Sequence, residues 1–555
     1  MKGLHMKLDY NSLSDKKFWQ DADITLPEFD VREAAKKTFE KPVWVHFGAG
    51  SLFRAFHAIV MQDLMNKGLS ESGVIAAETF DYEMVDLSYT PFDNLGIQIS
   101  LMPDGKLQKT LIGSVAGALK CDGAFAGDQE KLEKIFENPS LQMVTFTITE
   151  KGYALKDMHG EYTGLAQKDF ENGPLGCSHA MSKVTALLYK RFKAGAAPIA
   201  MVSTDNCSRN GEKLRTAVVT VAQEWEVRGF VTNEFLAWVS DEEKVSFPWT
   251  TIDKITPRPA QSVADELIGA GLEGMDIKIT GKGGYTATFV NAEKPQYLVI
   301  EDRFPNGRPE LDKAGVYLTD RDTVNKFERM KVCTCLNPLH TALAVYGCLL
   351  GYKSIASEMT SPELKALVEK IGYQEGMSVV TDPGIIKPED FIREVIEERL
   401  PNPYMPDTPQ RIACDTSQKV PIRFGETLKA YAEVDSKNNV DTNDHTASYV
   451  AKLTYVPLAI AGWIRYMTGI DDNGEKFECS SDPMLAELQE MISGVRFGDP
   501  DSVNEEMLKP ILSNKTLFAI DLPGIGLSGK ITGMVKEMLR GKGAVLDTLK
   551  KYTRA

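Results

Sequence analysis

The first half of the chain alternates short apolar runs with segments of helical periodicity, and this alternation limits the possible fold more than any other feature. The first run, residues 41–50 (KPVWVHFGAG), ends in glycines, and apolar residues then recur at helical spacing over residues 51–68. Later apolar runs have the length of strands and are separated by helical segments; they are 73–78, 95–102, 141–150 and 197–204. Strands that alternate with helices in this way predict a parallel sheet with crossover helices.

The second half has a different pattern, because amphipathic helical segments dominate after about residue 320. The segment 301–315 (EDRFPNGRPELDKAG) is rich in turn residues and is a candidate hinge. We therefore expect an α/β domain over residues 1–318, followed by a mostly α-helical domain over residues 319–555.

Composition disfavours several classes of partner. The 555 residues carry a formal net charge of −15, which disfavours nucleic acid and anionic membranes and requires a local basic cluster for any anionic substrate. No apolar run reaches the roughly 18 residues of a transmembrane helix, and the N-terminus has no apolar signal-peptide core. We therefore expect a cytoplasmic protein with no nucleic-acid or membrane partner. The sequence specifies no oligomeric state.

Metal chemistry has little support in the sequence. The eight cysteines do not form a disulfide scaffold in so long a chain, and the seven histidines form no HxH, HxxxH or HExxH pair. Cys333, Cys335 and His340 are the one candidate cluster, but a structural zinc site usually has four ligands. A metal- or redox-sensing protein that uses these three residues is the alternative from a different functional class.

Gly48 and Gly50 lie where the first apolar run ends and a helical segment begins. At such a position, backbone N–H groups and a helix N-terminus can hold a pyrophosphate. The third glycine of the GxGxxG pattern is absent because Phe53 occupies its position, and a plain strand-to-helix turn explains the two glycines equally well. Arg54 places a positive charge in the first helical turn, where the helix dipole disfavours it, so we expect it to reach a cofactor phosphate.

A dinucleotide site also needs a carboxylate at the end of the second strand, where it binds the adenosine ribose. Residues 73–83 supply Glu78, with Asp81 as the second candidate, and a solvated acid at a strand end is the simpler explanation of either. A carboxylate here repels a 2′-phosphate, so NAD(H) is expected rather than NADP(H). We thus expect residues 1–318 to form a Rossmann-type NAD-binding domain.

The segment 330–347 (MKVCTCLNPLHTALAVYG) contains the residue types that oxidise a secondary alcohol. A lysine can accept the hydroxyl proton, while asparagine and histidine can donate hydrogen bonds to the developing oxyanion. Lys331, Asn337 and His340 are of these types. Asn337-Pro338 is also typical of a helix N-cap, so we expect a helix that starts near Asn337 and Lys331 in a non-helical lead-in. Taken alone, the segment favours simpler roles: a cap, a first-turn histidine and an exposed lysine.

Several segments, taken in order, resemble the mannitol dehydrogenase family, the polyol-specific long-chain dehydrogenases and reductases. They are GAGSLFRAF (48–56), TFTITEKGY (145–153), STDNCSRNG (203–211), TTIDKITP (250–257), YLVIEDRFPNGRPELDKAG (297–315), FERMKVCTCLNPLH (327–340) and PYMPDTPQRIACDTSQKVPIRF (403–424). The ordered set spans roughly residues 40–430 and is far more specific than any single motif.

The resemblance implies a role for each matching residue, and it implies that no metal is needed. Lys331 would be the general acid/base. The implied carbonyl-polarising residues are Asn337 and Asn206, and the implied ligands of substrate hydroxyls are His340 and Asp253. Two acids would lie near the lysine, Glu150 and Glu328. The implied NAD(H) ligands are Gly48, Gly50, Arg54 and Glu78.

The chain departs from the family pattern between Lys331 and Asn337, where the interval is six residues instead of the usual five. Either a bulge or a different lysine position is therefore expected. The form of this segment most resembles the branch of the family that interconverts keto-hexuronates and aldonates. Such a substrate carries a carboxylate, for which Lys419 and Arg423 are candidates, although most lysines and arginines are ordinary surface charges. A polyol substrate, which needs no carboxylate-binding cation, is the alternative.

Overall fold

The computed structural model describes residues 5–102, 104–440 and 447–554. The chain divides into two compact units, Met1–Asn325 and Lys326–Ala555, which we call the N-terminal unit and the C-terminal unit. The division lies within helix α11 (Arg321–Arg329), whereas the boundary expected from the sequence, 318/319, lies just before that helix.

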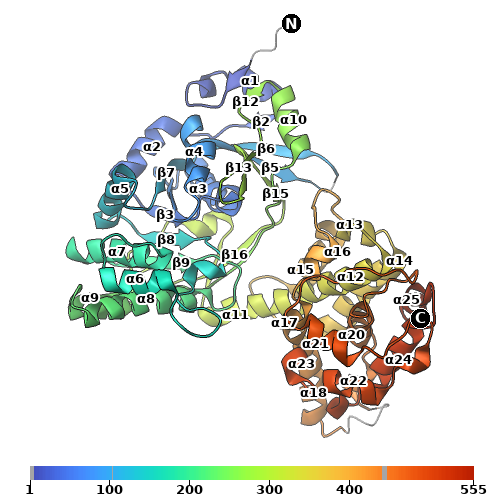
Figure 1. The fold of residues 1–555 in the computed structure, drawn as a ribbon. Coiled ribbons are helices and arrows are strands. Elements are labelled where there is room, and N and C mark those ends of the chain that lie inside the picture. The colour runs from blue at the N-terminus through green and yellow to red at the C-terminus, as the bar shows by residue number, and fades with distance from the viewer. Residues whose placement is uncertain (1–4, 103, 441–446, 555) are drawn as a thin grey trace. The chain divides into compact units, whose positions relative to one another are not determined.

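The N-terminal unit is built on a six-stranded, fully parallel sheet (Figure 1). Its strands, in spatial order, are β7 (Val115–Lys120), β4 (Val74–Glu78), β3 (Trp44–Phe47), β8 (Met143–Phe146), β9 (Ile199–Ser203) and β10 (Val245–Ser246). Numbered along the chain, the order is 3-2-1-4-5-6, as in sheets that bind dinucleotides. The Rossmann-type topology expected from the sequence is confirmed.

Both faces of this sheet are covered, because successive side chains of a strand point to opposite sides. Val45 and Phe47 of β3 belong to a core formed with helices α5 (Ala126–Glu137), α7 (Ala180–Lys193), α8 (Asn210–Val227) and α9 (Asn233–Ser240). Trp44 of the same strand belongs to a second core formed with α3 (Ala58–Asn66), β15 (Phe289–Glu293) and β16 (Tyr297–Glu301). Burial on both sides explains why the strands are almost continuously apolar.

The described part of the unit also contains a four-stranded sheet, a three-stranded sheet and two two-stranded sheets, β1 (Met6–Lys7) with β12 (Leu272–Glu273) and β13 (Lys278–Ile279) with β14 (Tyr285–Thr286). The first has the order β15–β5–β6–β2, in which β5 (Gly96–Leu101) and β6 (Leu107–Ile112) are antiparallel and β2 is Ile24–Thr25. The second has the order β11–β16–β17, with β11 at Thr250–Asp253 and β17 at Tyr317–Thr319. The strand expected at 95–102 is therefore present, but outside the Rossmann sheet. Further elements are α1 (Lys16–Asp21), α2 (Val31–Glu40), α4 (Glu83–Ser88), α6 (Gly164–Asn172) and α10 (Gln261–Gly269).

The C-terminal unit is mostly helical, as expected. Its α-helices are α12 (Asn337–Leu350), α13 (Ile355–Glu358), α14 (Pro362–Glu369), α15 (Pro388–Glu394), α16 (Pro409–Ile412), α17 (Thr416–Val420), α18 (Glu426–Lys437), α19 (Tyr449–Lys452), α20 (Tyr455–Tyr466), α21 (Leu485–Met491), α22 (Glu505–Leu512), α23 (Lys515–Phe518), α24 (Ser528–Met538) and α25 (Ala544–Thr553). α12 packs closely on α20, because a Cβ at Gly462 would lie 2.6 Å from the Tyr346 ring. The Tyr346 hydroxyl donates to the Leu458 carbonyl at 2.8 Å, which fixes this crossing.

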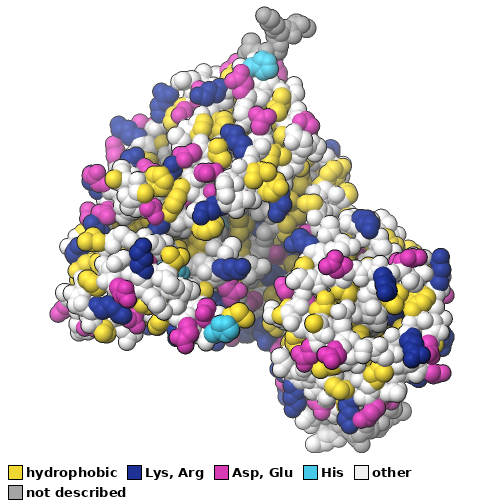
Figure 2. Space-filling view, in the orientation of Figure 1, with side chains coloured by type: hydrophobic (Ala, Val, Ile, Leu, Met, Phe, Trp, Pro, Cys, Tyr) yellow, Lys and Arg dark blue, Asp and Glu magenta, His cyan; other side chains and the backbone are white. Residues whose placement is uncertain are grey.

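One helical stretch among the described residues, Arg321–Leu350, is long and apolar enough to span a membrane. However, 78% of its most apolar window is buried inside the protein, as in the core helix of a globular domain. Acidic and basic side chains are interspersed over the faces of both units that are visible in Figure 2.

Candidate active site

The glycine loop follows β3 at the point where the strand order reverses, next to β8. Gly48 has φ +107°, and a Cβ there would lie 2.3 Å from the Thr147 carbonyl oxygen, so only glycine allows the two strand ends to approach. A Cβ at Gly50 would have no neighbour within 4 Å, so the backbone is open on that side. Open α/β sheets bind ligands in the crevice at such a reversal. The loop therefore fits a dinucleotide pyrophosphate.

Glu78, the last residue of β4, binds the glycine loop directly. Its Oε2 accepts the N–H of Ala49 at 2.9 Å, and its Oε1 accepts the N–H of Thr79 at 2.9 Å. Among the described residues, Oε2 accepts a single hydrogen bond and keeps a further lone pair. The other candidate, Asp81, accepts the Thr280 hydroxyl at 2.6 Å. Of the two acids, only Glu78 is bonded to the loop among the described contacts.

Arg54 is buried in a π-helical turn, Phe53–His57. Its Nη1 donates to the Ala287 carbonyl at 2.7 Å, and its guanidinium lies over the Tyr89 ring, 5.4 Å from the centroid. The Tyr89 hydroxyl donates to the Ala49 carbonyl at 2.6 Å, so Arg54 supports the glycine loop through this ring. Nε and Nη2 of Arg54 have no hydrogen-bond partner among the described residues, and burial lowers the pKa of the guanidinium. No sequence motif marks Tyr89.

Three of the motif segments meet where β8 and β9 end and β11 begins. Asp205, after β9, accepts the N–H groups of Ile148 and Thr149, which follow β8, at 3.0 and 2.8 Å. The Asn210 side-chain amide donates to the Thr250 hydroxyl of β11 at 2.9 Å. Burial raises the pKa of Asp205, while its hydrogen bonds lower it. These buried polar bonds fix the three segments relative to one another.

The predicted substrate residues of the N-terminal unit lie on this framework. Asn206 is exposed in the loop between β9 and α8, and Asp253 is the buried last residue of β11. Glu150 is exposed, forms an ion pair with Lys213 and lines an open groove of 810 Å³. The preceding residue, Thr149, has φ +65°, which is strained for a β-branched side chain. Such strain is concentrated at functional sites in proteins.

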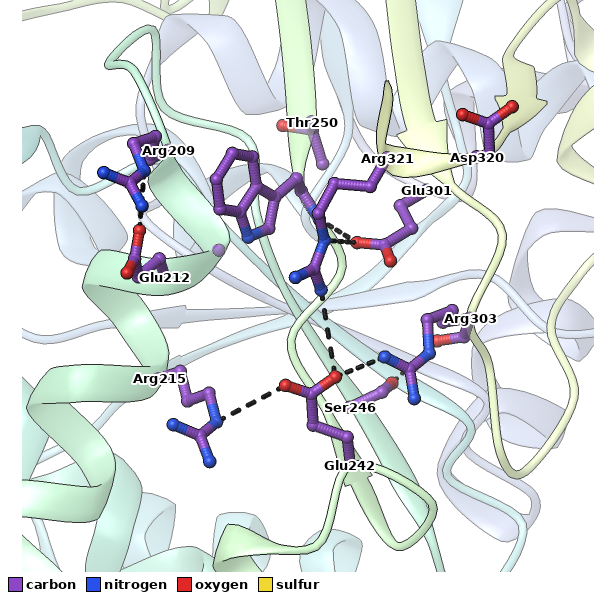
Figure 3. A network of polar contacts seen from close by, with 12 residues as sticks. Arg209, Glu212, Arg215, Glu242, Ser246, Thr250, Glu301, Arg303, Asp320 and Arg321 are labelled. Atoms are coloured by element: carbon purple, nitrogen blue, oxygen red, sulfur yellow. Dashed lines mark hydrogen bonds and ion pairs between the residues drawn. The ribbon is translucent and has the colours of Figure 1, made fainter. Parts of the chain in front are cut away.

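A network of arginine and glutamate side chains joins the elements around this framework (Figure 3). Glu242 pairs with Arg303 and, at 3.6 Å, with Arg215 of α8. Arg321 pairs with Glu301 at the end of β16 at 3.0 Å and approaches Glu242 at 3.8 Å. Because Arg321 is the first residue of α11, the network fixes the position at which this helix begins. Sequence patterns miss it because its members are far apart in the chain.

Lys331 does not lie in a non-helical lead-in, contrary to the expectation from the sequence. α11 continues through a π-helical turn, Met330–Cys335, and only one non-helical residue, Leu336, separates this turn from α12. The N–H of Leu336 donates to the Lys331 carbonyl at 3.1 Å, which is the i→i+5 bond of a π-helix. This turn is the bulge that accommodates the six-residue interval. Lys331 is only 2% exposed, and Glu328 lies one turn before it in α11.

Asn337 opens α12, as predicted, but its side chain does not cap the helix. The N-cap residue is Leu336, no side-chain cap bond is formed, and Pro338 lies in the first turn. One turn later, Nε2 of His340 lies 3.5 Å from Oδ2 of Asp407. Burial lowers the pKa of His340 to about 4, although the Asp407 charge acts in the opposite direction. The imidazole is therefore neutral near pH 7.

Arg423 and Lys419 have different surroundings. Arg423 donates to the Thr341 hydroxyl at 2.5 Å, and burial lowers the pKa of its guanidinium to about 10. The Lys419 ammonium donates to the backbone carbonyls of Ile412, at 3.1 Å, and Cys414. Lys419 thus holds the backbone with two of its three N–H groups, whereas Arg423 makes a single protein bond among the described contacts.

Two further cations belong to this cluster, and sequence reasoning missed both. The charges of Arg399, Arg411 and Arg423 all lower the pKa of His340, so these guanidinium groups lie close enough to act on the imidazole. The opposing charge is Asp407, which is paired with Arg411. The neighbourhood of His340 therefore has a local excess of positive charge, of the kind that an anionic substrate needs in a chain of net charge −15.

Cys333 and Cys335 are buried within the π-helical turn. Burial raises the pKa of the Cys333 thiol to about 11 and also raises that of Cys335. This shift opposes formation of the thiolates that a metal site requires. Among the described residues, no group of three or more His, Cys, Asp and Glu side chains is arranged to hold a metal ion.

Both units of the chain match models of known protein families. Residues 43–313 match the model of the mannitol dehydrogenase Rossmann domain, and residues 323–539 match that of the mannitol dehydrogenase C-terminal domain. The D-mannonate oxidoreductase of Thermotoga maritima is 50% identical over 548 residues, covering 98% of this chain and 99% of the relative. That of Escherichia coli is 28% identical, covering 86% and 89%.

A solved structure has the same fold. Pseudomonas fluorescens mannitol 2-dehydrogenase, in a ternary complex with NAD and D-mannitol, aligns with a TM-score of 0.68 and 23% identity, covering 99% of this chain and all of that one. The sheet order and glycine loop define a dinucleotide-binding α/β enzyme of two units. The chain belongs to the mannitol dehydrogenase family and is an oxidoreductase that acts on CH–OH groups. The resemblance inferred from the ordered motifs is thereby confirmed.

Proposed function

We propose that the chain catalyses the NADH-dependent reduction of a keto-hexuronate, D-fructuronate, to D-mannonate, and the reverse oxidation. The observation that carries this proposal is the set of guanidinium groups around His340, which suits a substrate with a carboxylate. The 50% identity to a D-mannonate oxidoreductase over 98% of the chain supports it. Reduction of tagaturonate is the nearest alternative, because that substrate differs in the configuration of one hydroxyl. Mannitol 2-dehydrogenation is a weaker alternative, because it uses no carboxylate-binding cation.

For the cofactor we propose NAD(H), held by the loop with Gly48 and Gly50, with Glu78 as the ribose ligand. Glu78 is preferred to Asp81 because it is bonded to the glycine loop and keeps a free lone pair on Oε2. Its negative charge would repel a 2′-phosphate. Arg54 is proposed to favour the pyrophosphate, as a positive charge that supports the loop through Tyr89. When bound, NADH supplies the hydride.

Each remaining role concerns a proton or a hydrogen bond to the substrate. Lys331 donates a proton from Nζ to the carbonyl oxygen as it becomes an alcohol, and accepts it in the reverse direction. The amides of Asn206 and Asn337 donate hydrogen bonds to that oxygen as negative charge develops on it. The neutral His340 imidazole and the Asp253 carboxylate bind neighbouring hydroxyls.

The substrate carboxylate is assigned to Arg423, because a guanidinium can bind a carboxylate through two parallel hydrogen bonds. Arg423 has donors left after its bond to Thr341. Lys419, which holds two backbone carbonyls, is assigned a supporting charge. The substrate is therefore a small sugar acid.

The decisive measurement is NADH oxidation with D-fructuronate, D-tagaturonate and D-fructose in parallel, repeated with NADPH. We expect the highest kcat/KM with D-fructuronate and NADH. A preference for tagaturonate or fructose would select the corresponding alternative, and no oxidation with any of the three would reject the proposal.

Replacing Lys331 by Ala separates catalysis from mere nucleotide binding. We expect kcat/KM to fall by about 10²–10⁴-fold, because a general acid/base is lost. NADH binding, followed by fluorescence titration, should persist. Lys365→Gln, which changes an exposed lysine of α14, is the matched control and should retain full activity.

A further inference from the structure

The segment that precedes α16 holds an acidic residue, Asp407, which lies in the motif segment 403–424 but was given no role from the sequence. Its backbone is fixed on both sides, because its N–H donates to the Met405 carbonyl at 2.8 Å and its carbonyl accepts the Ile355 N–H at 2.9 Å. The next residue, Thr408, caps α16 by accepting the N–H of Arg411 at 3.2 Å. The Asp407 carboxylate is buried and therefore has a defined position.

This carboxylate faces two side chains of the cationic cluster. Oδ1 accepts a hydrogen bond from the Arg411 guanidinium, and Oδ2 lies 3.5 Å from Nε2 of His340. Nε2 is buried, and at 3.5 Å from Asp407 it makes no hydrogen bond to any described residue. The His340 side chain is 16% exposed, so its exposure belongs to other atoms of the ring. Nε2 is therefore the ring nitrogen that lies beside Asp407, and the exposed atoms of the side chain are others.

The charges around His340 favour the same orientation of its ring. Three guanidinium groups, those of Arg399, Arg411 and Arg423, act on the imidazole, and Asp407 is the carboxylate that acts against them. A neutral imidazole carries its proton on one nitrogen only, and a carboxylate next to one nitrogen favours the proton there. The other nitrogen is then an acceptor for a donor such as a hydroxyl.

We propose that Asp407 is a positioning residue, which holds His340 in its Nε2–H tautomer so that Nδ1 accepts a hydrogen bond from a substrate hydroxyl. This inference rests on the proposed function for the identity of the substrate, but the tautomer itself does not depend on it. The 3.5 Å separation is expected to shorten when substrate binds, since catalytic hydrogen bonds are often long without ligand.

The tautomer is tested on the full-length protein with ¹⁵N-labelled histidine. The His340 ring signals are identified as those missing from a His340→Gln spectrum. We expect Nε2–H with an unprotonated Nδ1 in the unaltered protein, and loss of this preference in Asp407→Asn. A dominant Nδ1–H form, or ring signals unchanged by Asp407→Asn, would overturn the proposal. Because this readout needs no turnover, it remains informative even if none of the three keto-sugars is a substrate.

Kinetics test whether Asp407 acts through His340. We expect Asp407→Asn to lower kcat/KM for the keto-sugar by about 10–100-fold, the effect typical of partners that orient a histidine. NADH affinity and the melting temperature should be unchanged, and Asp407→Glu should recover part of the loss. The matched control is Asp390→Asn, which changes an exposed aspartate of α15.

In a His340→Gln background, Asp407→Asn should cost much less than it does alone, because the two residues act as a pair. An equal cost in both backgrounds would assign Asp407 a purely structural or Arg411-dependent role and overturn the proposal.

Discussion

A single buried carboxyl group, that of Glu358, shows how strongly burial changes the protonation of a side chain in this protein. Glu358 ends α13 and lies against α12, where a Cβ at Gly347 would be 1.8 Å from Oε1. Neither carboxyl oxygen has a hydrogen-bond partner among the described residues, and burial raises the pKa to about 10. The group is therefore neutral in the folded state, and Gly347 must be glycine because the carboxyl occupies the space of its side chain.

Replacing Glu358 by Gln should make the protein more stable at high pH. The pKa of Glu358 is higher in the folded state than in the unfolded state, where it is about 4.5. Its contribution to the stability of the folded state is therefore complete below pH 4.5 and is lost as the pH rises toward 10. The loss is about 1.4 kcal/mol per pH unit. Urea unfolding should therefore give a gain for Glu358→Gln that grows from pH 6 to 9. A gain that does not depend on pH, or one equal to that of the partly exposed control Glu369→Gln, would contradict this.

At the same scale, Arg423→Gln should separate recognition of the carboxylate from catalysis. Loss of a hydrogen bond between charged groups costs about 1.5–3 kcal/mol, so KM for the keto-hexuronate should rise about 10–100-fold. Turnover of D-fructose, which has no carboxylate, should be unaffected. The exposed Arg393→Gln is the matched control. Equal losses with both sugars would show that Arg423 supports the helix rather than the carboxylate.

At the scale of elements, the α11–π-turn–α12 stretch is the feature that local patterns described least well. Asn337-Pro338 correctly marked where α12 begins, but the residues before it continue as helix instead of forming a loop. An extra residue in a helix can be accommodated in a single π-turn. The interval from Lys331 to Asn337 is therefore compatible with a lysine in the family position.

Deleting Val332, a partly exposed residue of this turn, tests that explanation. We expect the π-turn to become an α-helical turn, so that the variant folds and reduces its keto-sugar at a rate close to that of the unaltered enzyme. Melting temperature and kcat are the measurements. If the variant folds but loses activity, the extra residue itself sets the direction of Lys331. Deleting Thr341 in the middle of α12, which has no bulge to absorb the change, should unfold the region and serves as the contrasting control.

At the scale of the whole molecule, the chain divides into two compact units, and the proposed cofactor site belongs to the N-terminal unit. The proposed cofactor, NADH, is expected to add about 2.7 kcal/mol of stability to the folded state at 100 times its Kd. Calorimetry should therefore show an upward shift of one unfolding transition, assigned to the N-terminal unit, and little change in the other. Equal shifts of both transitions would mean that the two units unfold as one.

The sequence by itself determined the features that depend on neighbouring residues. The alternation of strands and helices gave the parallel sheet, Gly48 and Gly50 marked the loop at its first strand, and the ordered motifs identified the family. These succeed because a strand, a helix start or a glycine turn is specified by a few consecutive residues. The β5 strand was also visible, but its membership of another sheet was not, because strand pairing is a long-range property.

Only the tertiary structure decided which side chains meet. In the folded protein, Glu78 rather than Asp81 is hydrogen-bonded to the glycine loop, and the Tyr89 hydroxyl donates to the same loop. The tertiary structure also brought Asp407 to His340 and surrounded the imidazole with Arg399 and Arg411. These partners are separated by tens of residues in the chain, and their positions follow from how the helices and strands pack. The desolvation that makes His340 and Glu358 neutral follows from the same packing, because it depends on what covers a group and not on its neighbours in sequence.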